Sequence, residues 1–133
     1  MRSRERSRTE RGAAAVEFAL VFPMVIMLLI TVFEFSRLWN IQATLTDAAG
    51  IAARYAGIHH DDDDVIEQAT AEAMLIPGLF DWSTATIDVD PPDCEGAGVA
   101  TATISVSPGS ITEWFTTALG SPIELNASGR MPC

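Results

Sequence analysis

The chain has 133 residues, 48% of them hydrophobic, and a formal net charge of −10. This length leaves room for one small domain beside a membrane segment. The charges are separated: residues 1–12 hold five arginines against two glutamates, and the rest holds three arginines against sixteen acidic residues. An acidic body repels phosphate backbones, so the composition argues against nucleic-acid binding.

An apolar segment, AAAVEFALVFPMVIMLLITVF, follows the arginine-rich start at residues 13–33. As a helix it spans about 31 Å, close to the hydrocarbon thickness of a bilayer. The preceding arginines predict a cytoplasmic N-terminus and an extracytoplasmic C-terminal domain. A cleaved secretory signal is disfavoured because the segment ends in FEFSRLW, without a small-residue cleavage site. The sequence therefore predicts a single-pass protein of the cell membrane, with its transmembrane helix at residues 13–35.

One acidic residue, Glu17, lies near the start of this apolar segment. An unpaired carboxylate costs at least a few kcal/mol near the bilayer centre. In one interpretation Glu17 is shallow enough to reach the headgroups. In the other it has a cationic partner: cleavage after Gly12 would give Ala13 a free amine one helical turn away, on the same chain or on a neighbouring subunit.

Three motifs of this region resemble those of a known family. The TadE-like proteins, pilin-like components of the tight-adherence (Flp) pilus and secretion apparatus, share an R-G-x-x-x-V-E-F-A-L-V-x-P start, an E-F-x-R segment and an A-A-x-x-A-R-Y-A segment. The matching stretches here are Arg11-Gly12 followed by AAAVEFALVFP, then Glu34-Phe35-Ser36-Arg37, and AAGIAARYA at residues 48–56. The resemblance covers about residues 11–58.

The resemblance implies how the protein is processed and which partners it contacts. It implies a basic cytoplasmic leader, residues 1–12, that a prepilin-type peptidase removes between Gly12 and Ala13. It also implies that Glu17 acts in the register or membrane extraction of subunits during assembly. The expected partners are the membrane, the peptidase, and other pilin-like Tad subunits and assembly proteins.

The helical pattern continues beyond the membrane segment. Apolar residues recur at helical spacing as far as residues 55–56, which predicts one helix from Ala13 to about Ala56, with residues 36–58 extending it outside the membrane. Residues 43–57 are rich in alanine and glycine. Such a small face packs either on the protein's own sheet or on the helix of another subunit.

The remaining part, residues 59–133, is expected to be an extracytoplasmic α+β domain. Residues 84–90, 100–107 and 123–131 alternate between apolar and polar side chains, which is typical of strands with one buried face. The predicted fold is a long N-terminal helix packed on a small antiparallel three-stranded sheet, as in pilins.

The only cluster that invites a metal hypothesis is His59-His60-Asp61-Asp62-Asp63-Asp64. Consecutive acids diverge and lack the spacing of a calcium loop, so no metal site is predicted. The favoured interpretation is a capping box, Asp64-Val65-Ile66-Glu67, at the start of a helix that runs to about Met74. A metal-responsive envelope module using this cluster is the weakest functional alternative.

Two further pairs of residues are candidates for structure or binding. Cys94 and Cys133 lie on the same side of the apolar segment, and a disulfide between them would stabilise the domain by roughly 3–4 kcal/mol in an oxidising compartment. Free or intermolecular thiols are the alternative. Trp114 and Phe115, in an expected short helix, belong either to the core or to an exposed patch for a partner.

No catalytic constellation or phosphate-binding loop is visible, so we expect neither an enzyme nor a cofactor. The leading hypothesis is a minor pilin or pseudopilin that takes part in assembly of a tight-adherence pilus or related secretion and adhesion apparatus. Its rival is an uncleaved single-pass adaptor whose outer domain binds another envelope protein.

Overall fold

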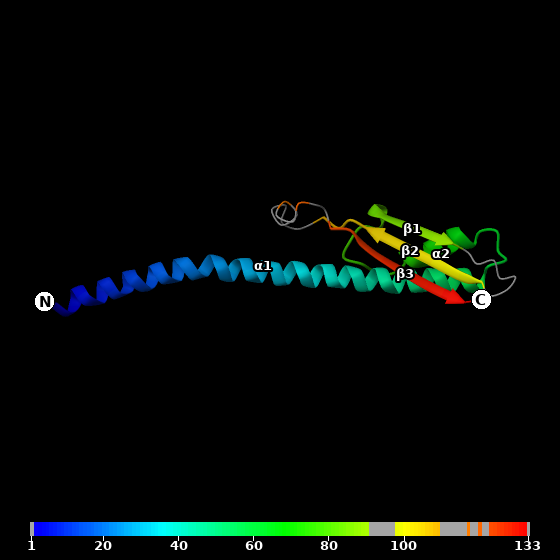
Figure 1. The fold of residues 1–133 in the computed structure, drawn as a ribbon. Coiled ribbons are helices and arrows are strands. Elements are labelled where there is room, and N and C mark those ends of the chain that lie inside the picture. The colour runs from blue at the N-terminus through cyan, green and yellow to red at the C-terminus, as the bar shows by residue number, and fades with distance from the viewer. Residues whose placement is uncertain (1, 91–97, 110–116, 118–119, 121–122, 133) are drawn as a thin grey trace. The chain divides into compact units, whose positions relative to one another are not determined.

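The computed structural model describes residues 2–90, 98–109, 117, 120 and 123–132, with the backbone alone for residues 2–11. The chain divides into two compact units, Met1–Phe35 and Ser36–Cys133. Its elements, in chain order, are α1 (Arg2–Ile58), α2 (Val65–Met74), a 3-10 turn (Trp82–Thr84), β1 (Ala85–Asp90), β2 (Val99–Val106) and β3 (Leu125–Pro132) (Figure 1). The predicted α+β class, a long N-terminal helix with a small antiparallel sheet, is confirmed.

Helix α1 contains the whole predicted helix and extends it at both ends. It begins at Arg2, within the basic leader, and it continues through Pro23. It ends at Ile58, one residue beyond Gly57, where the His59 amide donates a last helical bond to the Tyr55 carbonyl, 3.0 Å away.

The three strands form one antiparallel sheet in the order β1-β2-β3. Ile87 of β1 pairs with Ile104 of β2, which in turn pairs with Ala127 of β3. The predicted strands are thus confirmed, with small changes at their ends. Thr84 belongs to the 3-10 turn rather than to β1, and Ile123 lies before β3.

The 3-10 turn before β1 is capped by an aspartate. The Ser83 amide donates to the Asp81 carboxylate at 2.9 Å. Because backbone and side-chain hydrogen bonds from Ser83 stabilise its charged form, the pKa of Asp81 is lowered below its ordinary value. This cap stabilises the 3-10 turn that leads directly into β1.

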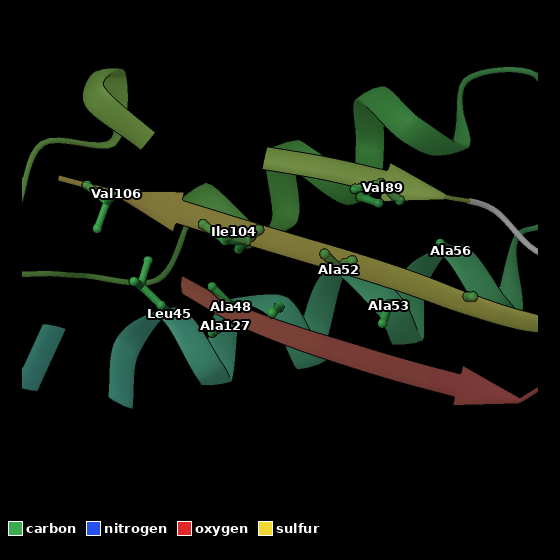
Figure 2. Close-up of a cluster of buried hydrophobic side chains, with 14 of the residues drawn as sticks. Leu45, Ala48, Ala52, Ala53, Ala56, Val89, Ile104, Val106 and Ala127 are labelled. Carbon is green, nitrogen blue, oxygen red and sulfur yellow. The ribbon is translucent and has the colours of Figure 1, made fainter. Parts of the chain in front are cut away.

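One face of the sheet is covered by the second half of α1 together with α2 (Figure 2). The alternating apolar residues of each strand point into this layer, as predicted, whereas Val99 at the start of β2 is exposed. The largest fully buried side chains are Ile41, Leu45 and Ile104. Most of the remaining core is alanine: Ala48, Ala49, Ala52, Ala53, Ala56, Ala69, Ala73, Ala100, Ala102 and Ala127 are buried. The small face of the helix therefore packs on the protein's own sheet, the first of the two alternatives.

The alanine-rich interface brings the helix backbone very close to β3. A Cβ atom added to Gly129 would lie 2.2 Å from the carbonyl oxygen of Ala49. No side chain fits in that space, so glycine is required at this position for steric reasons. The alternation that predicted β3 did not reveal this requirement.

The capping box expected at Asp64 is wrong. Asp64 occupies the N-cap position of α2, but its side chain makes no capping hydrogen bond to the helix backbone. The side-chain amide of Gln68 donates to the Asp64 carboxylate instead, and Gln68 accepts from the Tyr55 hydroxyl. The Asp64 carboxylate therefore belongs to a network of side-chain hydrogen bonds that links α1 to α2. The predicted end of α2, at about Met74, is confirmed.

Candidate functional site

The first candidate region is the apolar part of α1. Within the described residues, one helix, Gly12–Ile58, is long and apolar enough to cross a membrane, and none of its most apolar window is buried. Its exposed side chains include Val16, Phe18, Leu20, Val21, Phe22, Met24, Val25, Met27, Leu28, Leu29, Val32, Phe33 and Phe35. Water solvates such a surface poorly, since each Å² of apolar area left exposed forgoes about 25 cal/mol. This apolar helix indicates a single-pass membrane protein.

The predicted processing and assembly residues lie at the start of this surface. Gly12, Ala13 and Glu17 are all exposed and all helical. Ala13 and Glu17 are four residues apart, which places them on the same side of the helix, about 6 Å apart along its axis. Among the side chains that the structure describes, none forms an ion pair with Glu17.

The end of the apolar segment carries a second acidic residue, whose burial the sequence did not predict. Glu34 is 2% exposed, the one charged side chain that is buried in the described part of the chain. It lies one turn before Arg37, whose Nη1 donates to the Gly109 carbonyl at 2.8 Å. Both residues belong to the E-F-x-R motif. The signal available in the sequence was a glutamate directly after the apolar segment, but an acidic residue at such a position also commonly faces solvent.

The part of α1 beyond the membrane segment is tied to the sheet by polar contacts as well as by its alanines. Arg37 bonds the segment that follows β2, and the Gln42 side-chain amide donates to the Asn126 carbonyl of β3 at 2.8 Å. These bonds hold this half of the helix against its own sheet.

The histidines of the acidic loop between α1 and α2 contact neighbouring side chains of the same region. The ring of His59 stacks on Tyr55 with centroids 4.2 Å apart, and the imidazole of His60 lies 3.4 Å from the Asp61 carboxylate. Desolvation, and then the nearby Asp62, Asp64 and Glu72, raise the pKa of Tyr55. Over the described part of the chain, no group of three or more His, Cys, Asp or Glu side chains is arranged to hold a metal ion.

The other candidate residues lie outside the described residues. These are Cys94 and Cys133, expected to pair, and Trp114 and Phe115, expected to belong to the core or to a partner patch. The disulfide and the role of the two aromatic residues therefore stay predictions.

Comparison with known proteins gives one finding for the N-terminal region. Residues 12–54 match the family model described as TadE-like protein. No curated protein and no solved structure matches the chain. The matched region begins at Gly12, takes in Glu17, Glu34 and Arg37, and ends in the buried part of α1.

The match supports association with the Tad pilus and with the membrane, in the manner of a pilin-like component. It covers most of the segment, about residues 11–58, in which three motifs predicted the resemblance, and it stops before the sheet. Over residues 12–54, the chain is similar to the TadE-like family.

Proposed function

We propose that the protein is a minor pilin-like subunit that enters, or primes, the assembly of a tight-adherence pilus or related secretion apparatus. The observation that carries the proposal is the position of Glu17 in the TadE-like segment, on an exposed apolar helix, one turn after Ala13. The protein acts by assembly and not by catalysis. Its N-terminus is in the cytoplasm and its sheet domain lies outside.

The mechanism begins with removal of the leader. Cleavage between Gly12 and Ala13 by a prepilin-type peptidase leaves a free amine at Ala13, which is largely protonated at neutral pH. Both residues are in the helical conformation, so the peptidase has to unwind the turn around them. Gly12 favours this opening, because glycine is about 1 kcal/mol less stable in a helix than alanine.

The new amine then gives Glu17 a partner. A charged residue in the bilayer core costs about 2.5–3.5 kcal/mol on insertion scales, and pairing with a cation offsets part of that cost. When the pair forms between two subunits, the acid of one helix is level with the amine of its neighbour. That contact sets the axial register of neighbouring helices and favours association over an isolated helix in lipid.

The first test is the mass and N-terminal sequence of the protein extracted from membranes. A mature chain that starts at Ala13 is expected. A chain that keeps residues 1–12 would contradict the cleavage step and would favour the uncleaved adaptor.

The second test compares Glu17→Ala with the neighbouring Val16→Ala as a matched control. Both variants are expected to insert into membranes as the unaltered chain does. Glu17→Ala should abolish most pilus output, whereas Val16→Ala should preserve it. Equal output from the two variants would remove Glu17 from the mechanism.

A further inference from the structure

The start of β3 carries a recognisable five-residue motif. The chain has two asparagines, Asn40 and Asn126, and the second lies in ELNAS, residues 124–128. An asparagine followed two positions later by serine or threonine, without an intervening proline, is the acceptor sequence for N-linked glycosylation. Bacterial acceptor sequences also have an acidic residue two positions before the asparagine, and Glu124 occupies that position. Residues 124–128 therefore contain every element of the motif.

The three polar residues of the motif are accessible. Glu124, Asn126 and Ser128 are exposed, whereas Ala127 is buried in the core. Because successive side chains of a strand point to opposite faces, Asn126 and Ser128 point away from the face that α1 and α2 cover. The Asn126 backbone carbonyl accepts a hydrogen bond from the Gln42 side chain at 2.8 Å. Within the described part of the chain its side-chain amide makes no hydrogen bond, so the acceptor nitrogen is available.

A polar hollow lies beside Asn126 on this face of the sheet. The register aligns Thr86 of β1, Ser105 of β2 and Asn126 of β3 in one row across the three strands. Directly paired residues have Cβ atoms about 4.5–5.5 Å apart, so a group attached to Asn126 reaches its neighbours in the row. Hydroxyl side chains both donate and accept hydrogen bonds, as sugar hydroxyls do. The hollow, of about 160 Å³, is lined by Thr84, Thr86, Ser105, Val106, Ser107 and Glu124.

We propose that Asn126 is the acceptor of an N-linked oligosaccharide, and that the hollow beside it gives the first sugar hydroxyl partners. The inference rests on the proposed function in one respect: the sheet domain has to lie outside the cytoplasm, where lipid-linked oligosaccharides are transferred to protein. A glycan at Asn126 covers the face of the sheet opposite α1. In any assembly that the protein enters, that face therefore points to solvent.

The transfer has one nucleophile and one leaving group. The side-chain amide nitrogen of Asn126 attacks the anomeric carbon of an oligosaccharide carried on polyprenyl diphosphate. The new bond joins that nitrogen to the anomeric carbon, while the bond from the anomeric carbon to the diphosphate oxygen breaks. A base of the transferase takes one amide proton, and polyprenyl diphosphate leaves. The Ser128 hydroxyl and the Glu124 carboxylate bind the transferase and position the amide.

The fold sets the time of the transfer. A transferase binds its acceptor as an unpaired segment of chain, whereas β3 is paired with β2 from Leu125 to Pro132. Asn126 is therefore modified before β3 joins the sheet, while the domain emerges from the membrane. After folding, the amide is on the exposed face, so the attached glycan does not disturb the core.

The first test is the mass of the full chain purified from the envelope of the cells that produce it. The peptide that contains Asn126 should carry one oligosaccharide, which fragmentation mass spectrometry locates on that residue. A wholly unmodified peptide would overturn the proposal.

The second test uses variants of the full chain in a bacterial host that supplies an oligosaccharyltransferase and a defined polyprenyl-diphosphate oligosaccharide. Asn126→Gln should abolish the modification, and Asn40→Gln, an exposed asparagine outside the motif, should preserve it. Glu124→Gln should lower the modified fraction about fivefold or more, because a charge-assisted contact with the transferase is lost. Ser128→Ala should abolish most of it, and Ser128→Thr should retain it, because threonine keeps the hydroxyl. Modification that survives Asn126→Gln or Ser128→Ala would overturn the proposal.

A C-terminal tag with a second acceptor sequence, D-Q-N-A-T, separates this inference from the proposed function in the same host. Two glycans are expected on the tagged chain, and one on its Asn126→Gln variant. A glycan on the tag alone would overturn the inference and leave the extracytoplasmic domain intact. No glycan at either position would mean that the domain is not outside the cytoplasm, which contradicts the inference and the proposed function together.

Discussion

Gly129 lies at the point where β3 approaches the backbone of α1, and the contact leaves no room for a side chain. A glycine that is required by a close contact between two backbones is difficult to predict from the sequence. The alternation of Leu125, Ala127 and Met131 predicted the strand and its buried face. It did not predict which buried position touches a carbonyl oxygen of the helix, because that depends on the separation of helix and sheet.

We expect Gly129→Ala to destabilise the folded chain by about 3 kcal/mol or more, since the added methyl group forces the strand away from Ala49. Gly109→Ala is the control, because a Cβ at Gly109 meets nothing within 4 Å. The free energy of unfolding by urea, followed in detergent by near-ultraviolet circular dichroism, measures both. Equal stability of the two variants would mean that the close approach is absent in solution.

At the scale of the element, α1 serves two different environments. Its first half, up to Phe35, exposes large apolar side chains, and its second half buries mainly alanines against the sheet. The change coincides with the buried Glu34 and with Arg37. Helical periodicity predicted the buried stripe correctly. The residues on one face of a helix repeat every three or four positions, whichever structural element covers that face.

The buried stripe leads to a second prediction. Leu45 is fully buried between α1 and the sheet, whereas Leu75, after α2, is 74% exposed. Leu45→Ala should cost about 2–5 kcal/mol, from lost apolar burial and from the cavity that remains. Leu75→Ala should cost well under about 1 kcal/mol. Urea unfolding of the two variants measures this difference, and similar losses for both would contradict the observed packing of α1.

At the scale of the whole molecule, the apolar surface that needs lipid is concentrated in one of the two compact units. Large exposed apolar side chains are frequent from Val16 to Phe35, and the unit Ser36–Cys133 contains the sheet with its helical cover. The charge follows the same division, with the acidic residues gathered after the apolar segment. The second unit therefore has the composition of a water-soluble domain.

A fragment of residues 36–133 should accordingly remain in the supernatant after ultracentrifugation without detergent, and it should unfold cooperatively on heating. A matched fragment of residues 13–133 should require detergent, because it retains the apolar helix. Sedimentation and far-ultraviolet circular dichroism check the two. Aggregation of the shorter fragment would show that the sheet unit depends on the N-terminal segment for its stability.

The sequence by itself determined the apolar helix, the TadE-like segment, the three strands and the α+β class, because each depends on local periodicity or on contiguous motifs. It left open what the alanines of α1 contact, and it assigned Asp64 a backbone cap in place of its bond to Gln68. Only the tertiary structure decided these points, together with the burial of Glu34 and the steric need for Gly129. The contacts of the alanines, the burial of Glu34 and the space at Gly129 depend on distances between groups that are remote in the chain. The bond of Asp64 depends on which of two nearby donors it accepts from. Periodicity of the sequence carries no information about either.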